Sequence, residues 1–107
     1  MNKEEILAME VGEELDNLVQ EQIFGLVPDS ITSRRRYYKH YSTDISAAWQ
    51  VMEKMRAEWN ITMITGSLEI GRVVMHPLNR PEPVIEANAA SMPEAICKAT
   101  LIAKLAR

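Results

Sequence analysis

A short basic and aromatic segment carries the residues of this chain that are best suited to bind a ligand. From residue 34 to residue 41 the sequence reads Arg-Arg-Arg-Tyr-Tyr-Lys-His-Tyr, which holds all three tyrosines and four of the twelve lysines and arginines. Guanidinium groups bind phosphates, and tyrosine rings stack on bases. The segment runs into Ser42-Thr43-Asp44, which predicts a helix start whose free N–H groups could receive an anion.

The candidate ligand-binding residues therefore come from this junction: Arg34, Arg35, Arg36, Tyr38, Tyr41, Ser42, Thr43 and Asp44. A small nucleotide fits them better than duplex nucleic acid, because strong salt-dependent binding needs about six or more phosphate contacts. The same residues also have a structural interpretation. The tyrosines could cover a sheet edge, the arginines could meet acidic side chains, and Asp44 could simply cap the helix.

The charge of the chain is modest overall but unevenly distributed. The net charge of the 107 residues is −3 at pH 7, so no global field attracts nucleic acid. Residues 1–22 carry seven acids and one lysine, whereas residues 34–40 carry four positive charges and no acid. An acidic helix beside a basic loop suits a homo-oligomer or a partner protein of mixed charge, and a solvated acidic face would give the same pattern.

No residue pattern in the sequence predicts catalysis. The histidines and the cysteine, His40, His76 and Cys97, lack the paired spacing of zinc sites. Cys97 lies in an apolar helical run, where burial raises the pKa of a thiol. The sequence also lacks the serine-hydrolase elbow and the glycine-rich phosphate and dinucleotide loops. We therefore expect a protein that is not an enzyme and holds no metal and no cofactor.

Length and composition predict a single domain over residues 1–107. A single cysteine excludes an intrachain disulfide and favours a reducing compartment. The N-terminal residues lack the apolar stretch of a signal peptide, and no run approaches the roughly 18 apolar residues of a membrane span. We expect a cytoplasmic protein that does not enter a membrane.

Local signals predict the elements that would position these residues. Asn2 and Glu5 have the spacing of a capping box, Gly12 interrupts the first helix, and Gly25 is placed to end a main helix over 12–24. Periodicity and turn chemistry predict the later elements: a helix over 44–59, strands over 60–66, 71–76 and 84–89, and a helix from the cap at Ser91 to about residue 106.

This order, α-α-β-β-β-α, predicts an α+β fold with a three-stranded antiparallel sheet. A sheet with one face covered by helices would be stable at this size, and a sheet sandwiched by helices on both faces would be more so. The last helix is nearly all apolar, so it should lie buried across the sheet or be covered by a second subunit in a dimer.

Side-chain patterns predict the core. The tryptophans Trp49 and Trp59 are expected to be packed, with methionines filling irregular gaps at Met52, Met55 and Met63. The helix over 12–24 should bury its apolar stripe and leave its acids largely facing water, which are Glu13, Glu14, Asp16 and Glu21.

Three segments together resemble the phage ABA sandwich domain family. They are 13–19 (EELDNLV), 41–49 (YSTDISAAW) and 93–99 (PEAICKA), of which the second is the specific part. The resemblance covers roughly residues 3–105 and implies a small phage or prophage protein with an α/β/α-like sandwich. It implies no reaction and no catalytic residue. The hypothesis that follows is an accessory protein that binds a host or phage protein, and sequestration of a signalling nucleotide is the alternative.

Overall fold

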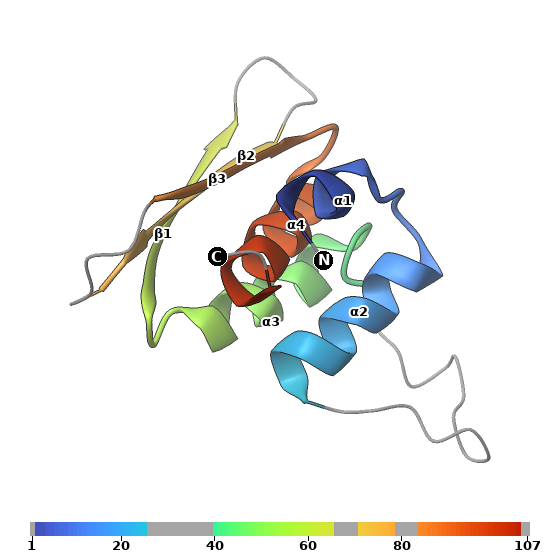
Figure 1. Cartoon of the computed structure of the whole chain (residues 1–107), viewed down its shortest axis with the longest axis horizontal. Helices are drawn as coiled ribbons and strands as arrows, with labels where there is room; N and C mark the ends of the chain where they lie inside the picture. The colour runs from blue at the N-terminus through green and yellow to red at the C-terminus, as the bar shows by residue number, and fades with distance from the viewer. Residues whose placement is uncertain (1, 26–39, 66–70, 79–83, 106–107) are drawn as a thin grey trace.

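The computed structural model describes residues 2–25, 40–65, 71–78 and 84–105. In chain order its elements are α1 (Lys3–Ala8), α2 (Glu13–Phe24), α3 (Ile45–Met55), β1 (Trp59–Thr65), β2 (Gly71–Pro77), β3 (Ile85–Ala89) and α4 (Met92–Leu105). Figure 1 shows their arrangement. The three-stranded antiparallel sheet and its helices confirm the predicted α+β class, although three helices precede the sheet in the chain where the predicted order had two.

Capping residues set the ends of the first two helices. Asn2 and Glu5 form the predicted capping box, because each side chain accepts the backbone N–H of the other, at 2.8 and 3.1 Å. Gly12 precedes α2 with a φ of 143°, and Gly25 ends it in the left-handed region with a φ of 74°. Glycine adopts these angles without steric strain. The helix break and the helix end predicted from the two glycines are thus confirmed.

Helix α3 is shorter than the sequence predicts. Asp44 caps its start as expected, by accepting a backbone N–H of the first turn at 2.9 Å. The helix then stops at Met55, and a turn closed by a 3.1 Å hydrogen bond from the Glu58 N–H to the Met55 carbonyl leads into β1. The prediction of a helix to residue 59 was wrong. Trp59 fits both the helical spacing of α3 and the strand alternation with Ile61, and the alternation prevails.

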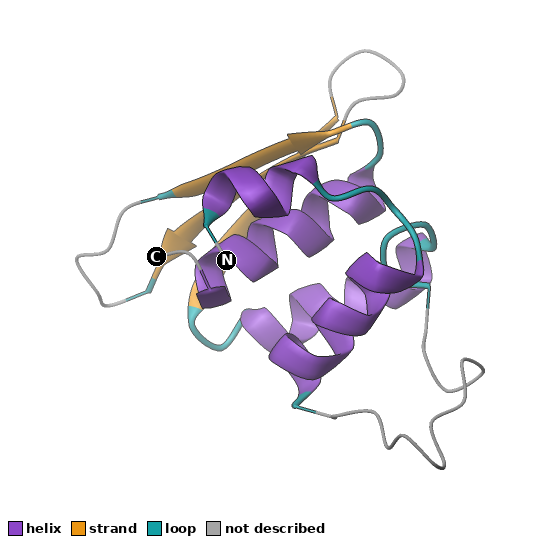
Figure 2. Ribbon diagram, turned by 45° about the vertical axis from the view of Figure 1, so that its right-hand side comes forward, coloured by secondary structure: helices purple, strands orange, loops and turns teal. Residues whose placement is uncertain are grey.

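The sheet has the order β1-β2-β3, and both pairs are antiparallel. Trp59 lies opposite Pro77, and Gly71 lies opposite Ala89. Figures 1 and 2 show that the described helices all lie on one side of the sheet, so within this part of the chain helices cover one face of the sheet and not both, as an α/β/α layering would require. The side chains of the other side, here called the open face, are exposed or half-buried: Asn60, Thr62, Ile64, Arg72, Val74, His76, Glu86 and Asn88.

Helix α4 is the centre of the fold. It packs on β2 and β3 and also contacts α1, α2 and α3, and every residue from Ala95 to Ala103 is buried. The prediction that this apolar helix lies across the sheet is confirmed, and the protein's own elements cover it. Gly71 permits the close approach of β2 to the start of α4, because a Cβ at this position would lie 2.6 Å from the Ser91 carbonyl oxygen and the Met92 Cα.

Candidate functional site

Tyr41, which ends the predicted ligand-binding segment, is a core residue. It is 3% exposed, and its hydroxyl donates a hydrogen bond to Gln20 Oε1 at 2.7 Å. Its ring stacks on Phe24 of α2, with centroids 5.4 Å apart. Burial raises the pKa of Tyr41, and the nearby Cys97 and Asp16 raise it further. Tyr41 therefore lies against α2 as a neutral, hydrogen-bonded side chain, and it does not cover the sheet.

Asp16 holds the next residue of the junction in place. The buried Ser42 donates its backbone N–H to Asp16 Oδ1 at 2.8 Å, while its hydroxyl accepts the Gly12 N–H at 3.1 Å. His40 Nδ1 lies 3.9 Å from Asp16 Oδ2. The prediction that Asp16 faces water was wrong, since it is 3% exposed. The sequence did carry a signal, because Asp16 precedes Val19 by three residues and therefore shares its side of the helix.

The structure describes four of the eight candidate ligand-binding residues. Tyr41 and Ser42 are buried, whereas Thr43 and Asp44 are exposed. Asp44 serves as the cap of α3, which agrees with its structural interpretation. The other four lie outside the described residues: Arg34, Arg35, Arg36 and Tyr38. A ligand-binding role for the junction thus stays a prediction from the sequence.

Cys97 has the environment of a structural thiol. It is a free cysteine buried within α4. Burial raises its thiol pKa far above the ordinary value, and the charges of Asp16 and Glu94 raise it further. A thiolate is the reactive form of cysteine. The expectation from the sequence, an elevated thiol pKa, is confirmed.

Lys98 forms a buried ion pair on the same helix. Its Nζ lies 2.6 Å from Glu94 Oε2 and donates a second hydrogen bond to the Leu7 carbonyl oxygen at 2.9 Å. The Lys98 side chain is 5% exposed and that of Glu94 15%. The carbonyl belongs to the last turn of α1, where a positive charge is favourable. Lys98 therefore attaches α1 to α4.

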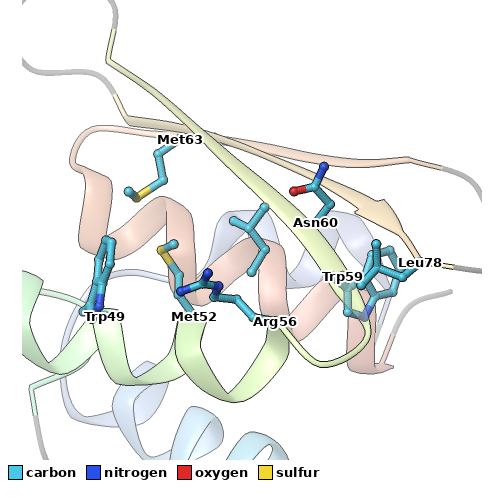
Figure 3. Close-up of a pocket in the computed structure, with 8 residues that line it drawn as sticks. Trp49, Met52, Arg56, Trp59, Asn60, Met63 and Leu78 are labelled. Carbon is cyan, nitrogen blue, oxygen red and sulfur yellow. The ribbon is translucent and has the colours of Figure 1, made fainter.

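The described surface contains an open groove between α3 and β1, shown in Figure 3 and called here the α3–β1 groove. Its volume is about 400 Å³. Trp49 and Met63 stand at one end of it, and Trp59 and Leu78 stand at the other. Eight residues line it, six of them apolar by type: Trp49, Met52, Arg56, Trp59, Asn60, Ile61, Met63 and Leu78.

Two residues predicted for the core lie at the surface beside this groove. Trp49 is 44% exposed and Met63 is 37% exposed, so both predictions were wrong. The expected packing of Trp59, Met52 and Met55 is confirmed, because all three are buried. Helix α3 lies at the edge of the helical layer, so only one side of it meets α4 (Figure 1).

The spacing along α3 contains the signal that sequence analysis missed. Ile45, Trp49, Met52 and Arg56 follow one another at intervals of four, three and four residues, which places them on one face of a helix. This face lies beside the buried stripe, and it forms the helical wall of the α3–β1 groove through its last three members.

In the described ranges, no group of three or more histidine, cysteine, aspartate or glutamate side chains could hold a metal ion. None of the described helices is long and apolar enough to cross a membrane.

Comparison with known proteins identifies the chain at the level of its family. Neither the curated proteins nor the solved structures yielded a match. The family model of the phage ABA sandwich domain matches residues 4–101 of the 107. This family is not a known enzyme family. The match covers α1 to most of α4, including the junction before α3 and the α3–β1 groove, and on this basis the chain belongs to the phage ABA sandwich domain family.

Proposed function

We propose that this chain is a non-enzymatic phage or prophage accessory protein that acts by binding another protein in the bacterial cytoplasm. The observation that carries the proposal is a concentration of exposed apolar side chains. Seven large ones are exposed in the described part of the chain, and three of these line the α3–β1 groove: Trp49, Met63 and Leu78. Exposed apolar clusters with a polar rim are typical of protein interaction sites.

The shape and chemistry of the α3–β1 groove favour a protein over a small molecule. Sites for small molecules usually enclose most of the ligand and aim several polar groups at it. This groove is open, and the cation in its lining, Arg56, already forms an ion pair with Glu53 at 2.9 Å. Tryptophan, methionine and arginine are side chains that protein interfaces favour. A protein partner can cover the groove and the exposed side chains around it together.

The buried ionisable groups support a role without catalysis. Asp16 accepts the Ser42 N–H, Lys98 binds Glu94 and the Leu7 carbonyl, and burial keeps the Cys97 thiol protonated. Each group therefore has a structural task inside the fold. An acid, base or nucleophile must instead reach a substrate from a cleft.

The acidic residues of the N-terminal part would assist the encounter with a basic partner. Five of them are exposed on α1, on α2 or between these helices: Glu4, Glu5, Glu10, Glu13 and Glu14. Exposed charges of one sign raise association rates, and added salt weakens this effect. The acidic helix is therefore an electrostatic supplement to the apolar site.

Two matched substitutions test the proposal. Trp49 and Val11 are both apolar and both 44% exposed, but only Trp49 lines the groove. Tagged wild type, Trp49→Glu and Val11→Glu would be recovered from cells that carry the phage, and the proteins bound to each would be quantified by mass spectrometry. Loss of a bound protein with Trp49→Glu, and its retention with Val11→Glu, is the expected result. Equal recovery from all three would refute a role of the groove.

A further inference from the structure

We propose that β1 pairs in antiparallel orientation with β1 of a second copy of this chain, around a two-fold axis at Thr62. The inference rests on the proposed function, because it names a second copy as the protein that covers the α3–β1 groove. The two three-stranded sheets would join into one continuous sheet, with the helices of both copies on the same side.

β1 is an edge strand without the features that usually keep edges unpaired. Among the described strands β1 pairs with β2 alone. No described strand pairs with the backbone N–H and C=O groups along its other edge. Its sequence, Trp-Asn-Ile-Thr-Met-Ile-Thr, contains no charge, proline or glycine. Edge strands of soluble proteins are usually protected by lysine, proline or bulges. A strand of this length offers about 23 Å of backbone for pairing.

The opposite edge of the sheet, β3, carries charge. Glu86 forms an ion pair with Arg72 of β2 at 2.9 Å. The pKa of Glu86 is lowered, first by the hydrogen bond from Arg72 and, as the smallest cause, by the positive charge of Lys3 in α1. The residues of β1 include no charged side chain. Of the two edges, β1 is the one suited to pairing.

The sequence of β1 is self-complementary about Thr62. With the axis at this residue, Ile61 of each copy lies opposite Met63 of the other on the side that faces the helices. On the open face Asn60 lies opposite Ile64, and Thr62 lies opposite its own copy. Each pair joins residues of the same face, so the core sides of the two sheets coincide. The Ile61–Met63 and Thr62–Thr62 pairs are of kinds that stabilise neighbouring strands. The Asn60–Ile64 pair is not, and no like charges meet.

Pairing of β1 also explains the exposed side chains next to it. Trp49 and Met63 stand together at one end of the α3–β1 groove (Figure 3). A second strand laid along β1 would bring Ile61 of the second copy opposite Met63 at this end of the groove. Repulsion between two copies of a protein with a net charge of −3 is weakest at an uncharged surface. β1 itself is uncharged, and five of the exposed acids lie on α1, on α2 or between them, although Glu58 directly before β1 is exposed as well.

Disulfide trapping tests the register. Thr62→Cys would place two cysteines directly opposite each other, with Cβ atoms about 5 Å apart before adjustment, close to disulfide geometry. Asn60→Cys is the matched control, because it lies on the same face of the same strand. Its two copies would stand about 13 Å apart, beyond the reach of a disulfide. The native Cys97 is buried and does not compete. The wild type would be measured in parallel by light scattering and by native mass spectrometry.

A wild-type dimer, together with at least tenfold more covalent dimer from Thr62→Cys than from Asn60→Cys under mild oxidation, is the expected result. A monomer at all concentrations up to about 100 μM would overturn the inference, and so would a dimer in which both cysteine variants cross-link equally. In either of these cases, loss of a different bound protein with Trp49→Glu and its retention with Val11→Glu would leave the proposed function standing. The two ideas can thus fail separately.

Discussion

Replacement of Lys98 by methionine should destabilise the protein far more than the same replacement of Lys104 on the same helix. The substitution keeps the length of the side chain but leaves the Glu94 carboxylate and the Leu7 carbonyl without their donor at the junction of α1 and α4. Removing one partner of a buried ion pair destabilises by about 3–5 kcal/mol. Because the Glu94 side chain retains 15% exposure, water can reach it in part, and we expect the lower end, about 3 kcal/mol.

Urea denaturation followed by circular dichroism measures this effect. With a slope of about 1.5 kcal/mol per M for a small domain, a loss of about 3 kcal/mol lowers the midpoint by about 2 M. Lys104→Met is the matched control, because Lys104 lies on the same helix but is exposed, and it should change stability by less than about 0.5 kcal/mol. The double variant Lys98→Met with Glu94→Leu should recover much of the loss, since no unpaired charge remains. If Lys98→Met unfolds at the same urea concentration as the wild type, the ion pair does not hold α1 on α4.

Three further predictions follow from the fold and the junction. Gly71→Ala should lower the melting temperature by roughly 10 °C or more, because the new Cβ would lie 2.6 Å from backbone atoms of Ser91 and Met92; an unchanged melting curve would show that these segments can separate freely. Stability should fall as pH rises above 9.0, the ordinary pKa of a thiol, and again above 10.0, that of tyrosine. Cys97 and Tyr41 have raised pKa values in the folded state, so the unfolded chain loses these protons at lower pH than the folded chain does. In melting curves recorded over a pH series, Cys97→Ala should reduce the decrease of the melting temperature above pH 9.0. A decrease as steep as that of the wild type would contradict this. Replacing Arg34, Arg35 and Arg36 by alanine should abolish binding of a nucleotide in calorimetry with little effect on melting temperature, and unaltered affinity would exclude the nucleotide alternative.

Much of the fold was predictable from local signals in the sequence. The capping box at Asn2, the left-handed end at Gly25 and the cap at Asp44 all act within one turn of the chain. The uninterrupted apolar pattern of α4 predicted its burial across the sheet. Such features depend on the residues next to them, so a single sequence is sufficient to find them.

The wrong predictions concern contacts with distant parts of the chain. Asp16 is buried because Ser42, twenty-six residues later, supplies an N–H donor to its carboxylate. Trp49 is exposed because α3 lies at the edge of the helical layer. An apolar residue on such a helix can face the core or lie at the edge of the core, and helical spacing alone does not distinguish the two. Periodicity defines the faces of a helix but not the element that covers each face. The candidate site at the α3–β1 groove could therefore be found only once α3 and β1 were placed side by side.

The position of α4 in the chain has a consequence for how this protein is made. Every other described element precedes α4 in the sequence, and α4 is the helix that β2, β3, α1, α2 and α3 all contact. While the ribosome is still synthesising residues before Met92, these elements lack their common packing partner. Their apolar faces therefore remain accessible to chaperones and proteases until α4 has left the ribosome. These elements can pack on α4 only once Met92–Leu105 has been synthesised, and a nonsense mutation before residue 92 would remove the helix on which they pack.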